Sequence, residues 1–79
     1  MPRYYFPTWD GDQFIADDAG LQLDGIEQAR GMALVALCEM AREVLPKSSQ
    51  PRTIKVCVMD GGDTPAMECR LTFELVERE

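Results

Sequence analysis

The residues that come closest to a chemical site are the acidic side chains of three predicted turns, at 10–12, 17–20 and 60–64. They are Asp10, Asp12, Asp17, Asp18, Asp60 and Asp63. Loops rich in carboxylate oxygens can hold calcium or magnesium. However, the spacing lacks the alternating ligands and the terminal bidentate glutamate of a calcium-binding loop, and Asp-Gly pairs are residues that tight turns require in any case. The pattern therefore favours turns over a metal site, and we expect neither a metal nor a cofactor.

Catalytic chemistry has little support in the sequence. The chain contains no histidine, which removes the commonest general base and every Ser/His or Cys/His pair. Gly61-Gly62 is not followed by the Lys-Ser/Thr of a phosphate-binding loop. A catalytic carboxylate pair would need a concave, desolvated site, which a small two-layer domain seldom has. We therefore predict that the chain is not an enzyme, and a metal-dependent or enzymatic regulator is the least favoured alternative.

Cysteine usage points to packing rather than to redox or metal chemistry. Three cysteines are present, Cys38, Cys57 and Cys69, and no two of them form a Cys-x-x-Cys pair. Each lies in an apolar pattern, where a free thiol behaves as a small hydrophobe. We predict that all three are reduced and buried.

Length, composition and charge limit the class of protein. The 79 residues are 46% hydrophobic and 28% charged, which is typical of one folded domain, predicted over residues 1–79. The formal net charge of −6 would repel a nucleic-acid backbone, so we predict no nucleic-acid binding by the chain alone. No apolar run approaches the roughly 20 residues that span a bilayer, and the N-terminus lacks a signal-peptide layout. The predicted location is cytoplasmic, without membrane attachment.

The N-terminal part of the sequence predicts a hairpin followed by a short extended piece. Arg3–Trp9 is rich in aromatic residues, and a turn signal at 10–12 leads into a second strand at 13–16. Pro7 cannot donate a ladder hydrogen bond, which indicates an edge or a bulge there. Alternation directs about half of the aromatic side chains to the core and the others to the opposite face. Leu21–Leu23 then extends toward the helix.

A long amphipathic helix is predicted in the middle of the chain. Asp24 and Glu27 have the spacing of a capping box, so the helix should begin at Asp24. It runs to about Leu45, because Pro46 excludes the helical conformation for the residue before it. Apolar positions at steps of three and four form the predicted core stripe. They are Ile26, Ala29, Ala33, Leu37, Met40 and Val44.

Two strands joined by a glycine turn complete the predicted fold. Thr53–Asp60 alternates between apolar and polar residues, Gly61 and Gly62 allow a tight turn, and residues 67–75 alternate again. The apolar members of the last strand are Met67, Cys69, Leu71, Phe73 and Leu75. The order ββ(β)αββ predicts an α+β fold of two layers, in which one long amphipathic helix packs on an antiparallel sheet.

The helix carries more apolar residues than the core stripe needs. The surplus residues are Met32, Leu34, Val35 and Cys38, and they lie a quarter turn or more away from the stripe. Gly31 lies among them and costs about 1 kcal/mol relative to alanine within a helix, which invites close approach of another backbone. Together with Trp9 from the aromatic first strand, these residues form the candidate interaction surface.

The sequence predicts a non-catalytic protein–protein interaction module that works through this helix surface or through the exposed face of the sheet. The expected partner is a second copy of the chain, which would give a homodimer, or another protein. In the alternative interpretation, the flanking loops and Trp9 cover the surplus side chains, which then serve only to pack within the chain.

The opening of the chain resembles a known family. The residues that carry the resemblance are Met1-Pro2-Arg3-Tyr4-Tyr5-Phe6, Asp10-Gly11, Asp17 with Gly20, Leu23, and Ala29-Arg30 followed by Ala33. The family consists of short bacterial proteins, mostly from rhizobia and related alphaproteobacteria, and is classified as a domain of unknown function. Members often carry a histidine directly after the opening aromatics. This chain has Pro7 there, so no role of that histidine transfers to it.

The order of elements is also similar, in topology, to the partial dsRBD-like domain of HicB-type antitoxins. Both have an aromatic first strand, an acidic turn and a short strand before an Ala-rich amphipathic helix. Such antitoxins usually carry a DNA-binding appendage as well, for which this chain has no room. The similarity implies an alternative function, an antitoxin-like inhibitor whose acidity neutralises a basic partner protein.

Overall fold

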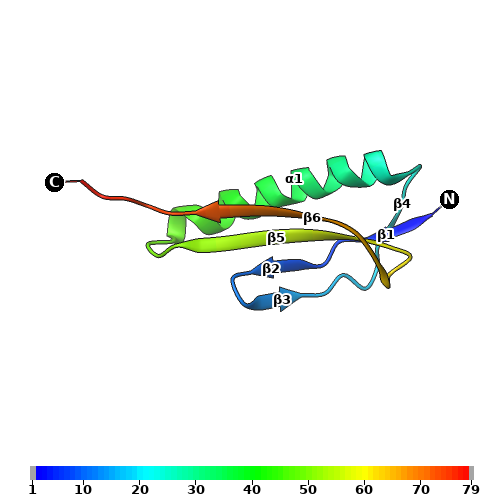
Figure 1. The fold of residues 1–79 in the computed structure, drawn as a ribbon, viewed down its shortest axis with the longest axis horizontal. Coiled ribbons are helices and arrows are strands. Elements are labelled where there is room, and N and C mark those ends of the chain that lie inside the picture. The colour runs from blue at the N-terminus through cyan, green and yellow to red at the C-terminus, as the bar shows by residue number, and fades with distance from the viewer. Residues whose placement is uncertain (1, 79) are drawn as a thin grey trace.

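The computed structural model describes residues 2–78. The elements, in chain order, are β1 (Arg3–Tyr5), β2 (Thr8–Asp10), β3 (Gln13–Ile15), β4 (Leu21–Gln22), α1 (Ile26–Val44), a short 3-10 helix η1 (Leu45–Lys47), β5 (Arg52–Asp60) and β6 (Thr64–Phe73). Figure 1 shows α1 lying along one side of the six-stranded sheet. The predicted α+β class is confirmed, with four short strands before the helix where two or three were predicted.

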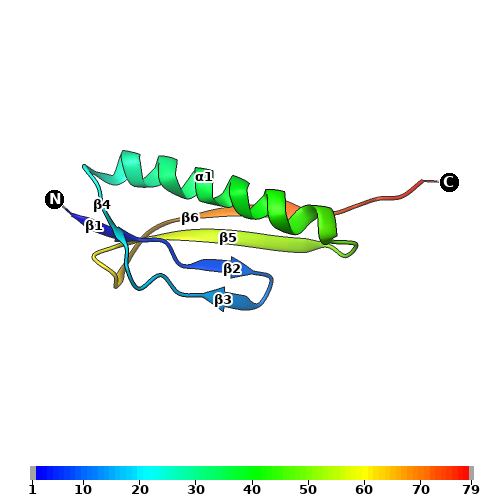
Figure 2. The ribbon, with the colours of Figure 1, turned by 180° about the vertical axis from the view of Figure 1, so that it is seen from behind.

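The sheet is antiparallel and organised around β5. β6 pairs with one side of β5 along its whole length, from Arg52 opposite Phe73 to Asp60 opposite Thr64. The other side of β5 pairs with β2 and, near the end of β5, with β1, so β1 and β2 lie end to end. β3 and β4 are the outer neighbours of β2 and β1. Seen from behind, β2 and β3 lie on the far side of β5 from α1 (Figure 2).

The first predicted strand is interrupted between β1 and β2, at the position of Pro7. The N–H of Cys57 donates to the Pro7 carbonyl at 2.9 Å, but Pro7 has no N–H with which to return the bond. Both parts of the strand keep the same register on β5. The predicted irregularity at Pro7 is therefore confirmed as a break in the ladder that leaves the register intact.

The core lies between α1 and the middle of the sheet. Ile54, Val56 and Val58 of β5 are almost completely buried. Ala29 and Ala33 of α1 have no exposed surface, and their small side chains let the helix lie close to the sheet. The remaining members of the buried cluster are Tyr4, Leu23 and Leu37.

Most of the predicted core stripe of α1 is confirmed. Its three central members are buried, and Met40 and Val44 pack against the core while keeping some exposure. Ile26 is the exception, because 41% of it is exposed. Helical side chains lean toward the N-terminus, so the first residue of α1 leans past the end of the helix rather than over a preceding turn.

The start of α1 differs from the prediction. The N-cap is Gly25 rather than Asp24, and no side chain caps it. The N–H of Asp24 donates to Oε1 of Gln28 at 2.8 Å. Because the helix begins later than predicted, the side chain that reaches back across the first turn is Gln28 and not Glu27.

The predicted end of the helix near Leu45 is confirmed, but Leu45 keeps helical dihedral angles (φ −65°, ψ −39°) directly before Pro46, so the expected exclusion of that conformation is wrong. α1 stops at Val44, and Pro46 lies within η1. The Ser48 hydroxyl donates to the Val44 carbonyl at 2.9 Å, which satisfies one of the last carbonyl groups of the helix. No helix among the described residues has the length and apolar character needed to cross a membrane.

The β5–β6 hairpin follows the predicted alternation, but the helix covers it less completely. Gly61 and Gly62 have positive φ in the turn, as predicted. β6 ends at Phe73, so Leu75 lies beyond the strand and is exposed. Leu71 is also exposed, because β6 is an edge strand and α1 lies mainly over β5.

Candidate interaction surfaces

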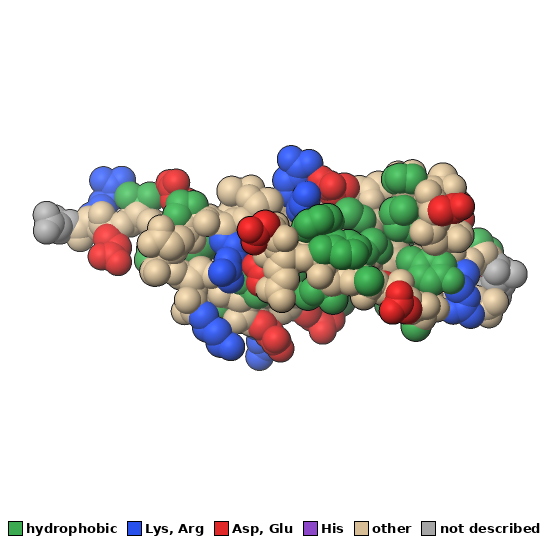
Figure 3. All heavy atoms as spheres, turned by 90° about the horizontal axis from the view of Figure 1, so that it is seen from below, with side chains coloured by type: hydrophobic (Ala, Val, Ile, Leu, Met, Phe, Trp, Pro, Cys, Tyr) green, Lys and Arg blue, Asp and Glu red, His purple; other side chains and the backbone are tan. Residues whose placement is uncertain are grey.

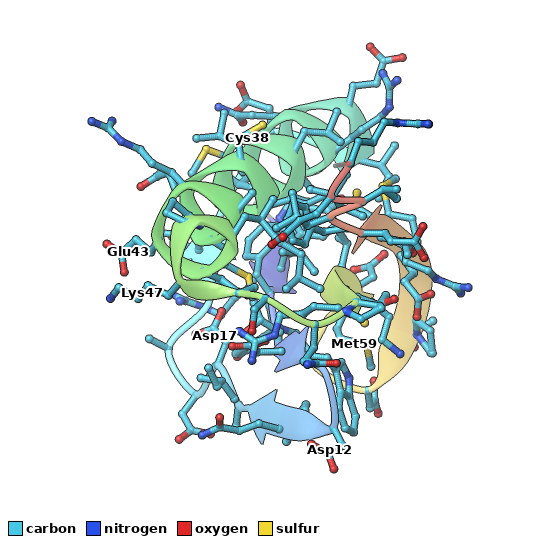
Figure 4. The ribbon with its side chains drawn as sticks, turned by 90° about the vertical axis from the view of Figure 1, so that its left-hand side faces the viewer. Asp12, Asp17, Cys38, Glu43, Lys47 and Met59 are labelled. Carbon is cyan, nitrogen blue, oxygen red and sulfur yellow. The ribbon has the colours of Figure 1, made fainter. Side chains whose placement is uncertain are left out.

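The predicted surface residues of α1 are accessible. Met32, Leu34 and Val35 are exposed, Val35 to 56% of its surface. Cys38 is exposed as well, and Figure 4 shows it on the side of α1 that points away from the sheet. Neither the flanking loops nor Trp9 cover these side chains.

Trp9 lies in the other layer of the molecule. It pairs with Lys55 in the β2–β5 ladder, and residues paired across neighbouring strands share a face. Because β5 buries Ile54 and Val56 beneath α1, alternation directs Lys55 and Trp9 to the opposite, open face of the sheet. The structure therefore does not bring Trp9 together with the helix residues.

Four exposed positions form one row along α1, which we call the helix seam. The seam consists of Gly31, Leu34, Val35 and Cys38. Steps of three, one and three residues keep these positions on one side of a helix. Met32 lies on a flank of this row, so the seam is narrower than the predicted surface.

Gly31 is not required by the fold of a single chain. A Cβ atom at this position would meet nothing within 4 Å. Its φ is not among the positive values that favour glycine, so other residues can adopt its conformation. Alanine would favour the helix by about 1 kcal/mol. No contact within the described residues 2–78 therefore requires glycine at position 31.

The open face of the sheet contains a hollow of about 360 Å³. Its lining residues, which define the open-face hollow, are Tyr5, Pro7, Phe14, Ala16, Asp17, Asp18, Met59 and Gly62. They come from β1, the link between β1 and β2, β3, the segment that follows β3, the end of β5 and the β5–β6 turn. Figure 3 views the molecule from below and shows hydrophobic side chains gathered near its middle, with acidic and basic side chains around them.

Two aromatic rings pack against each other beside this hollow. The ring centroids of Trp9 and Phe14 lie 4.8 Å apart. The Nζ atom of Lys55 lies 5.2 Å from the centroid of the Trp9 ring, within the range of a cation–π contact. Phe14 belongs both to this aromatic pair and to the lining of the hollow, whereas Lys55 lies outside the lining.

Asp17 links the turn between β3 and β4 to the backbone of Phe6, where the first strand is interrupted. Its carboxylate accepts hydrogen bonds from the N–H groups of Phe6, Ala19 and Gly20 at 2.9, 3.2 and 3.1 Å. Partial burial tends to raise the pKa of Asp17, but the three N–H donors outweigh it and hold the pKa below its ordinary value. The sequence placed Asp17 in a turn but missed its bond to Phe6. The signal for this bond in the sequence was an acidic turn that follows a strand interrupted by Pro7.

The family model for a domain of unknown function, DUF6894, matches residues 3–72. The chain belongs to the DUF6894 family. The matched region includes the helix seam, all residues that line the open-face hollow, and nearly all of β6. No curated protein and no solved structure matches the chain. The resemblance to a domain of unknown function is confirmed, and the function has to be argued from the surfaces themselves.

The acidic residues of the predicted turns do not converge in this DUF6894 chain. Asp10 Oδ1 lies 3.5 Å from Nε of Arg52 in an ion pair, and Asp17 binds backbone N–H groups. Asp12 lies in the β2–β3 turn, at the far end of the sheet from α1 (Figure 4). Within residues 2–78, no group of three or more possible ligands is arranged to hold a metal ion.

The cysteines of this DUF6894 chain are free, but they are less buried than predicted. Cys38 is exposed, and Cys57 and Cys69 are half-buried. Burial raises the pKa of Cys57, and the negative charge of Glu68, whose Oε1 lies 3.9 Å from the sulfur, raises it further. The prediction of three buried thiols is wrong because Cys57 faces the open side of the sheet, Cys69 lies on an edge strand, and Cys38 lies in the helix seam.

Proposed function

We propose that this DUF6894 chain is a non-catalytic protein interaction module that self-associates through the helix seam. The observation that carries the proposal is Gly31, which has open space above it at the N-terminal end of the exposed helix seam. A glycine lets a second backbone approach closely, and this would offset the helix stability that glycine loses relative to alanine.

Charge supports a second copy as the partner and an antiparallel arrangement of the two helices. Glu27 lies in the first turn of α1 and Arg42 in the last turn, and both lie on the seam side of the helix. A parallel pair would bring like charges together, whereas an antiparallel pair brings Glu27 near Arg42 of the second copy. A register centred between Leu34 and Val35 achieves this contact and forms an isologous two-fold interface.

The expected association is weak and reversible. Leu34 and Val35 supply the large apolar side chains of the seam, and the rest of it is small. A standard interface buries about 800 Å² on each partner, and a single helix row covers less than that. We therefore expect a dissociation constant on the order of micromolar or weaker, so association has to be measured over a wide range of protein concentration.

Analytical ultracentrifugation over this concentration range tests the proposal. We expect dimer formation that Val35→Asp and Leu34→Asp each weaken at least tenfold, because the charge would have to be buried between the helices. Val76→Asp is the matched control, since Val76 is 62% exposed and lies beyond β6. Circular dichroism verifies that each variant is folded. A strict monomer at high concentration, or equal effects of Val35→Asp and Val76→Asp, contradicts the proposal.

Gly31→Ala separates the fold from the interface. At low concentration this variant should be more stable by about 0.5–1 kcal/mol, because alanine favours the helix. At high concentration it should associate less, because the methyl group separates the two backbones. Added stability with unchanged association would show that Gly31 has no role in the interface.

Charge reversal tests the antiparallel arrangement. Glu27→Arg and Arg42→Glu should each weaken association, and the double variant should restore much of it. If the double variant associates no better than the single variants, the antiparallel pairing is wrong.

A further inference from the structure

We propose that the open-face hollow binds the guanidinium group of an arginine side chain carried by a basic segment of a partner protein. This inference goes beyond self-association, because the hollow and the helix seam lie in opposite layers of the molecule. A variant in one of them leaves the other surface intact. The two proposals can therefore hold or fail separately.

The shape and the apolar walls of the hollow suit the end of one long side chain. Its volume of about 360 Å³ lies at the lower end of the range for ligand sites. Tyr5 and Phe14 contribute aromatic rings to the lining, and Met59 contributes a flexible thioether. Guanidinium groups stack on aromatic faces, and the apolar stem of arginine covers apolar surface.

The charge of the lining selects a cation. The lining contains two carboxylates, Asp17 and Asp18, and no basic residue. The oxygens of Asp17 already accept three backbone hydrogen bonds. Asp18 is exposed, and among the described residues it makes no hydrogen bond or ion pair, so it is available to a ligand. A planar guanidinium can donate two parallel hydrogen bonds to such a carboxylate, which an ammonium group cannot do.

Two basic groups of the sheet, on Arg3 and Lys55, are held by other contacts. A guanidinium nitrogen of Arg3 donates to the Ala19 carbonyl at 2.7 Å. The Nζ atom of Lys55 lies over the Trp9 ring. Neither residue lines the hollow. The net charge of −6 also attracts basic segments from a distance, which favours a basic protein partner over a neutral one.

Titration with short peptides, followed by two-dimensional NMR of the ¹⁵N-labelled protein, tests this proposal. The probe is a blocked peptide with one arginine among glycine and serine residues. Matched peptides carry lysine or citrulline, the uncharged analogue of arginine, at the same position. We expect shifts confined to Tyr5, Phe14, Asp18 and Gly62, with arginine binding more tightly than lysine and citrulline not binding.

Two variants with the same change of charge locate the site. Asp18→Asn should weaken arginine binding by about three- to tenfold, because it removes a charge-assisted hydrogen bond. Asp12→Asn should change it less than about twofold, since Asp12 lies outside the lining and contributes only to the long-range field. Phe14→Ala should also weaken binding by removing a stacking surface.

Three outcomes would overturn the proposal. Equal binding of the citrulline peptide would show that no cation is recognised. An equal effect of Asp12→Asn and Asp18→Asn would show attraction by net charge alone. Shifts in the helix seam without shifts in the hollow would assign the peptide to the other surface.

Discussion

The C-terminal hairpin and the N-terminal strands of the sheet are built in different ways. β5 and β6 pair along the whole of β5, with one irregularity between Val58 and Met59. β1 to β4 are at most three residues long, and β3 is exposed along its whole length. The hairpin lies in contact with α1, whereas the outer N-terminal strands lie farther from it. β5 thus carries most of the buried face of the sheet, whereas Tyr4 is the one residue of β1 to β4 in the buried core.

This difference shows two ways of stabilising strand pairs. Regular alternation under a helix needs no special side chain, because burial of one face fixes the register. Short strands with a break bury too little surface for that, so single residues have to supply the missing contacts. Here Asp17 accepts a hydrogen bond from the N–H of Phe6 in the break, and Gly20 permits its own turn to approach Tyr4 and Tyr5 of β1 closely.

The largest expected effect is in the buried hairpin. Ile54→Ala should lower the free energy of unfolding by about 2–5 kcal/mol, because it leaves a cavity beneath α1. Ile15→Ala makes the same change in β3, where the side chain is 51% exposed, and should cost less than about 1 kcal/mol. Urea denaturation measures both values. Equal losses at the two positions would remove the contrast between the two halves of the sheet.

Asp17→Ala should be the most damaging change in the N-terminal strands. It leaves the N–H groups of Phe6, Ala19 and Gly20 without their acceptor, and we expect a loss of about 2–3 kcal/mol. Asp17→Asn keeps one oxygen acceptor and should lose less. Hydrogen exchange of these three amides locates the effect. Unchanged protection of the Phe6 amide in Asp17→Ala would show that its hydrogen bond to Asp17 contributes nothing to stability.

Acid should lower the stability of the fold by protonating the Asp17 carboxylate. The pKa of Asp17 is lower in the folded chain than its ordinary value of 3.8, so the unfolded state takes up the proton first as pH falls. The stability that the carboxylate contributes is present above the unfolded pKa and is lost as pH falls through the folded pKa. Unfolding measured between about pH 6 and pH 2 should therefore show a steeper acid loss in the wild type than in Asp17→Asn. Parallel profiles would contradict this assignment.

Gly20→Ala should cost about 1–2 kcal/mol, because a side chain is strained at positive φ. Its φ is 66°, and a Cβ atom would lie 2.8 Å from the Tyr4 carbonyl oxygen. Gly11→Ala is the control, since its φ is also positive but its Cβ would meet nothing within 4 Å. A larger loss in Gly20→Ala than in Gly11→Ala, by thermal denaturation, measures the close packing at Gly20. Equal losses of stability would show that Gly20 is needed only for its positive φ and not for close packing.

The smallest expected effect is on the open face. Lys55→Met keeps the apolar stem but removes the charge above Trp9, and should cost less than about 1 kcal/mol. Trp9 is the single tryptophan, so its fluorescence reports this contact directly. A changed emission spectrum with nearly unchanged stability is expected. An unchanged spectrum would show that Lys55 does not contact the ring in solution.

Much of the fold could be predicted from local patterns. The alternation of β5 and the glycine turn after it predicted the hairpin, and the three- and four-residue spacing in α1 predicted its buried stripe. The helix start was misplaced because Asp24 and Glu27 have the spacing of a capping box. In the structure the N-cap is Gly25, and it is Gln28 that accepts the hydrogen bond from the N–H of Asp24. Burial at Ile26, Leu71 and Leu75 was overestimated, because a pattern assigns a face to a residue but not the element that covers it.

The candidate surfaces depended more strongly on the tertiary structure. The sequence identified the surplus apolar residues of the helix and the unusual Gly31. It could not show that Trp9 lies in the opposite layer, or that Tyr5, Phe14 and Met59 line one hollow with Asp17 and Asp18. Tyr5 and Met59 are distant in the chain from the segment that carries Phe14, Asp17 and Asp18, and their meeting depends on which strands pair and in which register.

For this DUF6894 chain, the sequence by itself determined the class of fold, the order of the elements and the apolar row that the helix carries. These properties are local, because periodicity and turn chemistry act over a few residues. Only the tertiary structure decided that Asp17 binds Phe6 in the break of the first strand, that Gly31 has open space above it, and that the open face is hollowed. Each of these depends on contacts, or on the absence of them, between segments that lie far apart along the chain.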